Sequence, residues 1–255
     1  MKSTLYLLLF VLIFTGSKAY SQKPAFRVVA LSEDKGHHVA YSERAKVWLK
    51  ELAETGHFQI DFINNTSSIN EKMLSQYQLF IQLDYPPYNW SDASKAAFKN
   101  YIEQGKGGWI GFHHATLLGE FDGFPMWPWF SDFMGGIRYK NYIATFVSAK
   151  VNIEETKHPV MMGIESPFLI EKEEWYIYDK SPRTNVKVLA SVDEATYSPA
   201  SAIKMGDHPV LWTNEKMKAR NVYIFMGHSP LLFDNAAYTK MFSNAIFWAA
   251  QKDRN

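Results

Sequence analysis

Residues 107–116 read Gly-Gly-Trp-Ile-Gly-Phe-His-His-Ala-Thr, a short apolar run that enters a tight turn with two adjacent histidines. Small residues around such a turn lift one side chain above the carboxyl edge of a sheet, as in a nucleophile elbow. His113 stands at the position of the nucleophile, and the sequence contains no cysteine. We therefore exclude acyl transfer through a thiolate, because that chemistry needs a sulfur nucleophile.

Apolar runs alternate with helical patterns on the N-terminal side of this turn. The spacing predicts strands over 26–31, 58–63, 79–83 and 108–112, and helices over 39–54 and 69–76. A third helix is expected between Ser91, which is suited to cap it, and Gly105, which follows its end. This alternation predicts an α/β fold with a doubly wound, mostly parallel sheet, whose ligands bind beyond the carboxyl ends of the strands.

The second half of the chain is richer in β patterns. We expect it to extend the same sheet, with a buried returning strand over 221–226 and a closing amphipathic helix over 235–251. The other short β segments are expected over 144–153, 168–170, 175–178, 186–192 and 209–213.

The first residues resemble an export signal. A positive start is followed by an apolar run over 5–14 and a polar, small-residue stretch, so residues 1–21 are predicted to be a secretory signal peptide cleaved after Ala19 or Ser21. The run is shorter than the roughly 20 residues of a membrane span, although an uncleaved anchor is the alternative. We expect a periplasmic or secreted protein that leaves the membrane after cleavage, with residues 22–255 as one domain.

Composition narrows the class of partner. The net charge is +1, with acidic and basic residues mixed along the chain, which argues against nucleic acid or an anionic membrane as a partner. Aromatic residues make up 16% of the chain, and those in the loops over 85–90 and 121–133 are candidates for lining a cleft around a small molecule. Formation of a homo-oligomer is left open.

Histidines follow three of the predicted strands: His37 and His38, His113 and His114, and His228. Imidazole exchanges protons near neutral pH and binds metals, so we expect catalytic roles for His113 and His228 and ligand contacts from His38 and His114. His38, His113 and His228 are also the candidate metal ligands. The alternative is that these are structural histidines, and the orientation of each doublet is left open.

Two carboxylates accompany them. Glu174 precedes an apolar aromatic segment, where partial burial would raise its pKa into the range of a general acid or base. With the three histidines it would complete a ligand set for zinc or another divalent ion. A solvated charged run is the alternative. Asp84 ends the third strand and is expected to contact a ligand hydroxyl or to cap a turn. His158 and His208 are interpreted as structural residues of strand-entry turns.

Six segments together resemble the ThuA-like (trehalose utilisation) family: 111–116, 157–164, 173–176, 209–213, 227–228 and 245–250. The resemblance covers almost all of residues 22–255. It implies a class I glutamine amidotransferase-like (flavodoxin-like) fold in which another residue replaces the catalytic cysteine. His113 matches that position, His228 matches the histidine of the late strand, His37 or His38 matches the histidine after strand one, and Glu174 matches the acidic residue.

Two departures from the family pattern are expected to be local. Residues 218–221 replace a glycine-rich turn, and Trp127 and Trp129 add aromatics that would stack on a sugar ring. The resemblance implies a role in the use of disaccharides and oxidised (keto) sugars. Two functions are left open by the resemblance. One is an enzyme, which would be a sugar isomerase, lyase or hydrolase and not a glutamine amidotransferase. The other is a non-catalytic periplasmic carbohydrate-binding protein. A purely structural or partner-binding domain is the third reading.

Overall fold

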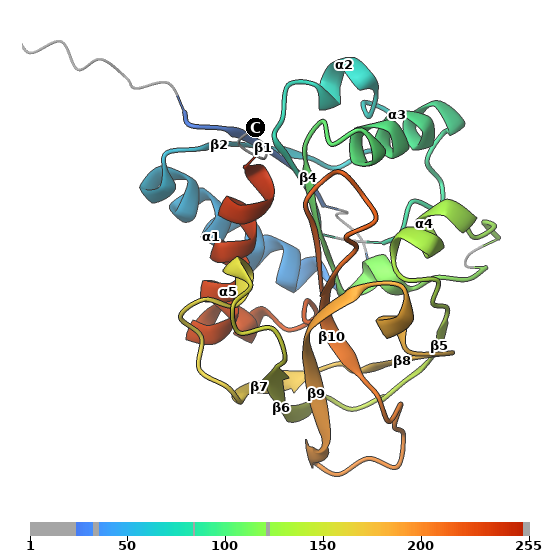
Figure 1. Ribbon diagram of the computed structural model, residues 1–255, viewed down its shortest axis with the longest axis vertical. Helices are drawn as coiled ribbons and strands as arrows, with labels where there is room; N and C mark the ends of the chain where they lie inside the picture. The colour runs from blue at the N-terminus through green and yellow to red at the C-terminus, as the bar shows by residue number, and fades with distance from the viewer. Residues whose placement is uncertain (1–23, 33–35, 84, 121–122, 252–255) are drawn as a thin grey trace, which may run out of the picture.

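The computed structural model describes residues 24–32, 36–83, 85–120 and 123–251. A nine-stranded sheet in the order β2-β1-β3-β4-β11-β10-β9-β6-β7 runs through the middle of the molecule (Figure 1). Its strands are β1 (Arg27–Leu31), β2 (Gln59–Ile63), β3 (Leu79–Gln82), β4 (Gly108–Phe112), β6 (Val147–Ile153), β7 (Phe168–Glu173), β9 (Lys187–Ser198), β10 (Pro209–Thr213) and β11 (Asn221–Ile224). A separate pair consists of β5 (Tyr139–Tyr142) and β8 (Tyr176–Tyr178).

The sheet has a parallel half and an antiparallel half. The pairs from β2 to β11 are parallel, and those from β11 to β7 are antiparallel, so β10 and β6 run against the other seven strands. The expected α/β fold with a mostly parallel sheet is confirmed. The β-rich second half does extend the same sheet, as predicted.

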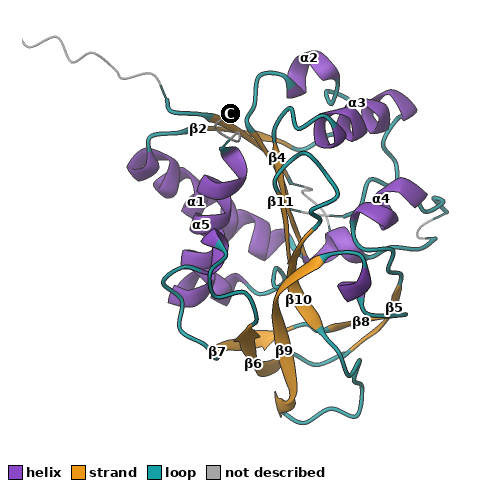
Figure 2. Ribbon diagram, in the orientation of Figure 1, coloured by secondary structure: helices purple, strands orange, loops and turns teal. Residues whose placement is uncertain are grey.

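Helices cover both faces of the parallel half. In Figures 1 and 2, α1 and α5 lie on one side of the sheet, and α2, α3 and α4 lie on the other. Four short 3-10 turns complete the order: η1 (His113–Thr116), η2 (Pro159–Met161), η3 (Pro182–Thr184) and η4 (Pro230–Asp234). The helices are α1 (Val39–Gly56), α2 (Glu71–Leu74), α3 (Asp92–Glu103), α4 (Pro128–Phe133) and α5 (Ala236–Ala250).

Local signals fix several of these boundaries. Ser91 caps α3 by accepting the N–H of Ser94 at 3.1 Å, and Gly105 follows the helix with φ +64°, both as predicted. The strand β5 and the helix α4 were not predicted, and β9 extends six residues beyond the expected end at 192. None of the helices in the described part of the chain combines the length and apolar character that a membrane span needs.

The central strand β4 is buried at all five residues and ends in the double-histidine turn. The loop after β11 passes so close to this turn that a Cβ on Gly227 would lie 3.0 Å from the Cβ of His113 and 3.1 Å from that of Phe112. A larger residue at 227 would require the two loops to shift by a few tenths of an ångström, so glycine favours the close approach of these histidine-bearing loops. The fold thereby brings the ends of β4 and β11 to one edge.

Candidate functional site

Four side chains that could bind a metal converge at this edge of the sheet: His38, His113, Glu174 and His228. One potential ligand atom from each lies within 4.8 Å of every other. In a tetrahedral zinc site with bonds of about 2.0 to 2.2 Å, ligand atoms are roughly 3.3 Å apart. Small side-chain movements would therefore bring all four atoms onto one ion.

Each of the four follows a strand whose carboxyl end faces the site. His38 lies at the N-terminus of α1 after β1, and His113 begins η1 directly after β4. His228 lies in the loop between β11 and η4, and Glu174 follows the last residue of β7. Because β1, β4 and β11 are parallel members of one sheet, their carboxyl ends meet at the same edge, where ligands bind in folds of this kind.

The elbow holds His113 in an unusual backbone conformation. Its φ is +28°, which is costly for a residue with a side chain. The carbonyl oxygen of His113 accepts hydrogen bonds from the hydroxyls of Thr116 at 2.9 Å and Tyr223 at 3.0 Å. These two buried hydroxyls fix the turn and so fix the direction of the ring.

The ring of His113 is arranged as a metal ligand would be. Its Nδ1 lies 2.9 Å from the carbonyl oxygen of Phe225, and a carbonyl oxygen only accepts, so Nδ1 must carry a proton. In a neutral ring, Nε2 then presents a lone pair, and it faces Oε2 of Glu174 at 3.1 Å. The nitrogen and the carboxylate oxygen attract each other at this distance only if Nε2 carries a proton or a cation lies between the two atoms. A backbone carbonyl behind the ring is a common second partner of metal-bound histidine.

His38 and His228 complete the cluster. Nε2 of His38 lies 2.7 Å from Nδ1 of His228, which in turn lies 3.4 Å from Oε2 of Glu174. Burial, followed by the imidazoles of His114 and His113, holds the pKa of His38 far below its usual range. His38 is therefore neutral, which is the form of histidine that binds metals.

Glu174 is ionised, contrary to the expectation of a raised pKa. Burial alone would raise it, but hydrogen bonds to His113 and His228 hold the pKa of Glu174 below its usual range. The carboxylate thus suits a metal ligand or a general base better than a general acid. Tyr176 beside it keeps its proton, since burial and the Glu174 carboxylate raise the pKa of this phenol well above its usual value.

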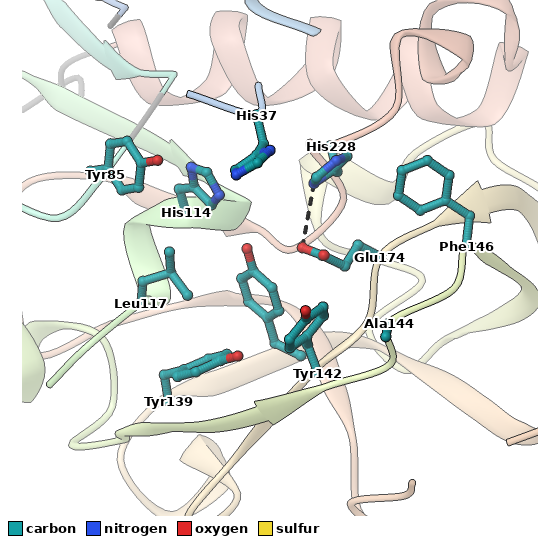
Figure 3. A pocket seen from close by; sticks show the side chains of 11 residues that line it. His37, Tyr85, His114, Leu117, Tyr139, Tyr142, Ala144, Phe146, Glu174 and His228 are labelled. Carbon is teal, nitrogen blue, oxygen red and sulfur yellow. Dashed lines mark ion pairs between the residues drawn. The ribbon is translucent and has the colours of Figure 1, made fainter. Parts of the chain in front are cut away.

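An open pocket of about 520 Å³ leads to these groups. Figure 3 shows His37, His114 and His228 on one side of it and Tyr139 and Tyr142 on the other, with Glu174 between them. The volume falls within the range of about 300 to 1,000 Å³ that small-molecule sites occupy. The lining residues are His37, Tyr85, His114, Leu117, Tyr139, Tyr142, Ala144, Phe146, Glu174, Tyr176 and His228.

A family model described as trehalose utilisation matches residues 27–249. The chain belongs to the ThuA family. A search of curated proteins gives no match.

Solved structures agree with this assignment. A ThuA-like protein from Bacteroides uniformis ATCC 8492 is similar with a TM-score of 0.81 and 28% identity over 92% of this chain and 95% of that one. A ThuA-like protein from Parabacteroides merdae ATCC 43184 has a TM-score of 0.63 and 19% identity over 91% and 93%. The glutaminase domain of Trypanosoma brucei CTPS has a TM-score of 0.50 and 8% identity over 90% and 96%, which shows a shared fold. The amidotransferase-like fold of the ThuA family is thus present here.

The structure resolves both histidine doublets in this ThuA protein. His38 is buried in the cluster, whereas His37 is exposed and lines the pocket. His113 is buried in the cluster, whereas His114 lines the pocket. The rings of His38 and His114 stack with centroids 3.2 Å apart, so both doublets contribute two residues to the site.

Other predicted ligand contacts fall elsewhere. Trp127 and Trp129 are not among the residues that line the pocket: Trp129 donates to Glu103 at 2.8 Å, and Trp127 stacks on Phe130. Trp129 in α4 and Trp127 just before it thus pack against neighbouring side chains, and a sugar contact from either indole stays a prediction. Asp84 lies outside the described residues.

The two histidines interpreted as structural have structural partners. His158 accepts the N–H of Val160 at the start of η2, and Nδ1 of His208 lies 2.9 Å from Glu194. Sequence reasoning missed three tyrosines that line the pocket, Tyr139 and Tyr142 of β5 and Tyr176 of β8. Tyrosines at both ends of a four-residue segment, Tyr139 and Tyr142, were the available signal.

Proposed function

We propose that this ThuA protein is a divalent-metal-dependent enzyme that acts on a neutral sugar or keto-sugar by acid–base chemistry. The observation that carries the proposal is the convergence of His38, His113, His228 and Glu174 within 4.8 Å beside an open pocket. Three imidazoles and one carboxylate suit zinc and similar transition metals. Bound there, such an ion would act as a Lewis acid that draws electrons from a substrate carbonyl.

The walls of the pocket favour an uncharged ring. Tyr139, Tyr142 and Phe146 present aromatic faces, which pack well against the C–H faces of a sugar. Lysine and arginine do not occur among the eleven lining residues, all of which belong to the described part of the chain. Phosphorylated sugars usually need such cations, so their absence from this lining favours an unphosphorylated substrate.

A keto-sugar carries an acidic C–H bond beside its carbonyl, and the site holds a base suited to it. Glu174 would take that proton on the carboxylate oxygen that does not bind the ion, and the C–H electron pair would become the C=C bond of an enediolate. Return of that proton to the former carbonyl carbon, while the proton of the neighbouring hydroxyl passes to the former carbonyl oxygen, moves the carbonyl by one carbon. Tyr176 would donate its hydrogen bond to a sugar oxygen throughout. The atoms balance without a co-reactant, so the reaction proposed is isomerisation.

Proton exchange in deuterated water tests this function. Keto-trehalose is incubated with the protein and about one equivalent of Zn²⁺, Mn²⁺ or Co²⁺, and ¹H NMR follows deuterium entry beside the carbonyl. We expect exchange that a chelator abolishes and that Glu174→Gln lacks. If trehalose or its keto form raises the melting temperature while no exchange occurs, the protein is a non-catalytic carbohydrate-binding protein. If neither metal nor sugar binds, the proposal is wrong.

We also propose that the protein works in the periplasm or outside the cell. The support is the sequence over residues 1–21, with its positive start and apolar run. Intact mass of the protein recovered from the periplasmic fraction tests it, and we expect a chain that begins at Tyr20 or Gln22. A chain that retains Met1 in the cytoplasm or in the membrane would contradict this location.

A further inference from the structure

Glu173 is a fully buried carboxylate next to the candidate ligand Glu174. Its Oε1 accepts the backbone N–H groups of Glu174 at 3.0 Å and His228 at 3.1 Å. Its Oε2 accepts the N–H of Ser229 at 3.3 Å. One side chain thus joins the end of β7 to the loop after β11, and both joined segments carry a member of the metal cluster.

An irregularity in β7 turns Glu173 inward. Regular alternation would bury Phe168, Ile170 and residue 172, but Lys172 is exposed and Glu173 is buried instead. The register with β6 shifts at this point, and Lys172 has a left-handed backbone with φ +49°. A bulge inserts one residue and reverses the facing of those that follow. Because consecutive residues then point in different directions, Glu173 enters the interior while Glu174 enters the pocket.

The hydrogen bonds of Glu173 join two segments whose side chains, His228 and Glu174, would have to lie close together to share an ion. Nδ1 of His228 lies 3.4 Å from Oε2 of Glu174, although 54 positions separate the two residues (228 − 174 = 54). Neither β7 nor β11 pairs with the other in the sheet, where β10, β9 and β6 lie between them. The hydrogen bonds of Glu173 therefore provide a direct link between the two backbone segments.

We propose that Glu173 is a positioning residue, whose buried carboxylate clamps the Glu174 segment to the His228 loop and so holds these two candidate ligands at metal-binding distance. The inference deepens the proposed function and rests on it for the metal readout alone. The clamp itself is present in the backbone hydrogen bonds without any metal. Removal of the Glu173 carboxylate would leave the N–H groups of Glu174, His228 and Ser229 without this acceptor. Unsatisfied donors are costly in a protein interior.

Glu173→Gln is the sharpest substitution, because it keeps the shape and one oxygen. The amide oxygen can still accept from Glu174 and His228, but the NH₂ group would face the N–H of Ser229, donor against donor. Glu194→Gln is the matched control. Glu194 is also a buried carboxylate that accepts two backbone N–H groups, those of Met205 and Gly206, and it is not a member of the metal cluster.

Two measurements on the full chain test the clamp. Hydrogen–deuterium exchange of metal-free protein should be faster in Glu173→Gln than in wild type over 172–176 and 226–231, with the rest of the sheet unchanged. Titration with Co²⁺, followed by its visible absorption, should show affinity reduced about 10- to 100-fold and a changed band shape, as for loss of an outer partner. Glu194→Gln should change neither property.

Unchanged exchange in both segments, or faster exchange across the whole sheet, would overturn the proposal, since Glu173 would then be inert or a general stabiliser. Wild-type affinity and band shape for Co²⁺ in a variant with faster local exchange would also overturn it. If wild type binds no Co²⁺, the metal part of the proposed function fails, and the exchange data still decide whether the clamp exists. Should Glu173→Gln not fold, Glu173→Asp serves in its place, because it retracts the carboxylate by one methylene group.

Discussion

Nε2 of His38 lies 2.7 Å from Nδ1 of His228, although 190 positions separate the two residues in the chain. The parallel order β1-β3-β4-β11 explains the contact, because it places the loops after β1 and β11 at the same edge, with the His113 turn between them. Two ring nitrogens at this distance form a hydrogen bond, in which one of them carries the proton. A metal that replaces this proton would use both nitrogens.

The adjacent residues His37 and His38 offer a matched pair. His38→Gln should lower metal affinity by more than the roughly 10- to 100-fold expected for loss of an outer partner, because it removes a direct ligand. His37→Gln should leave the affinity unchanged, since His37 lines the pocket but is not a member of the cluster. Competition against a chromogenic chelator measures both. Equal effects of the two substitutions would show that the cluster does not bind the ion.

The pocket tyrosines Tyr139 and Tyr142 should determine sugar affinity without affecting metal affinity. Tyr142 is 40% exposed at the pocket, so Tyr142→Ala removes a stacking face at little cost in stability. We expect sugar binding to weaken by about 1 kcal/mol, the scale of one aromatic contact, in isothermal titration of the metal-loaded protein. Trp129→Phe, on α4 outside the pocket lining, is the control. A larger loss in Trp129→Phe would identify this indole as a sugar contact.

Loss of a single hydroxyl should weaken the turn that carries His113. Tyr223→Phe removes one of the two donors to the carbonyl of His113 and should cost about 1 kcal/mol in urea unfolding. It should also lower metal affinity roughly 10-fold, because the ring of His113 loses part of its support. Tyr197→Phe removes a buried hydroxyl next to His208 instead, and it should cost similar stability with no change in metal affinity. If both variants lower the affinity alike, the effect is one of general stability.

At low pH, ionised Glu194 should no longer contribute to the stability of the folded protein. Burial opposes ionisation, but the hydrogen bonds from His208, Met205 and Gly206 hold the pKa of Glu194 below its usual 4.5. A carboxyl group with a lowered pKa in the folded state stabilises it fully above the unfolded pKa, and this stability is lost as the pH falls through the folded pKa. Glu194→Gln should therefore be less stable than wild type at neutral pH, and the gap should shrink below about pH 4.5. Urea unfolding at several pH values measures the gap, and a gap independent of pH would rule out this linkage.

The sequence predicted the parallel half of the fold well because its signals are local. Alternating apolar runs, the Ser91 cap and Gly105 each specify structure within a few residues. The antiparallel half was located but less well bounded, since β9 extends over twelve residues and β5 pairs with β8 outside the main sheet. Such pairings depend on contacts between distant segments, which periodicity does not record.

The site shows the same division. The histidines after strand ends correctly predicted that the candidate site lies at the carboxyl edge of the sheet, because parallel strands place their carboxyl ends together. The sequence singled out Glu174 but gave no role to Glu173, since the bulge at Lys172, which turns Glu173 into the interior, is not visible in the pattern. It also assigned a raised pKa to Glu174, because burial was visible in the pattern whereas the partners His113 and His228, which lower it, were distant in sequence.

The metal content of the full chain tests the central claim most directly. Wild type and the double variant His113→Gln, Glu174→Gln are dialysed in turn against excess Zn²⁺, Mn²⁺ or Co²⁺, freed of unbound metal, and measured by elemental mass spectrometry. The four-residue cluster predicts about one ion per wild-type chain and nearly none in the double variant, with both proteins folded by near-ultraviolet circular dichroism. A wild-type chain that retains no Zn²⁺, Mn²⁺ or Co²⁺, or a double variant that retains as much as wild type, would contradict it.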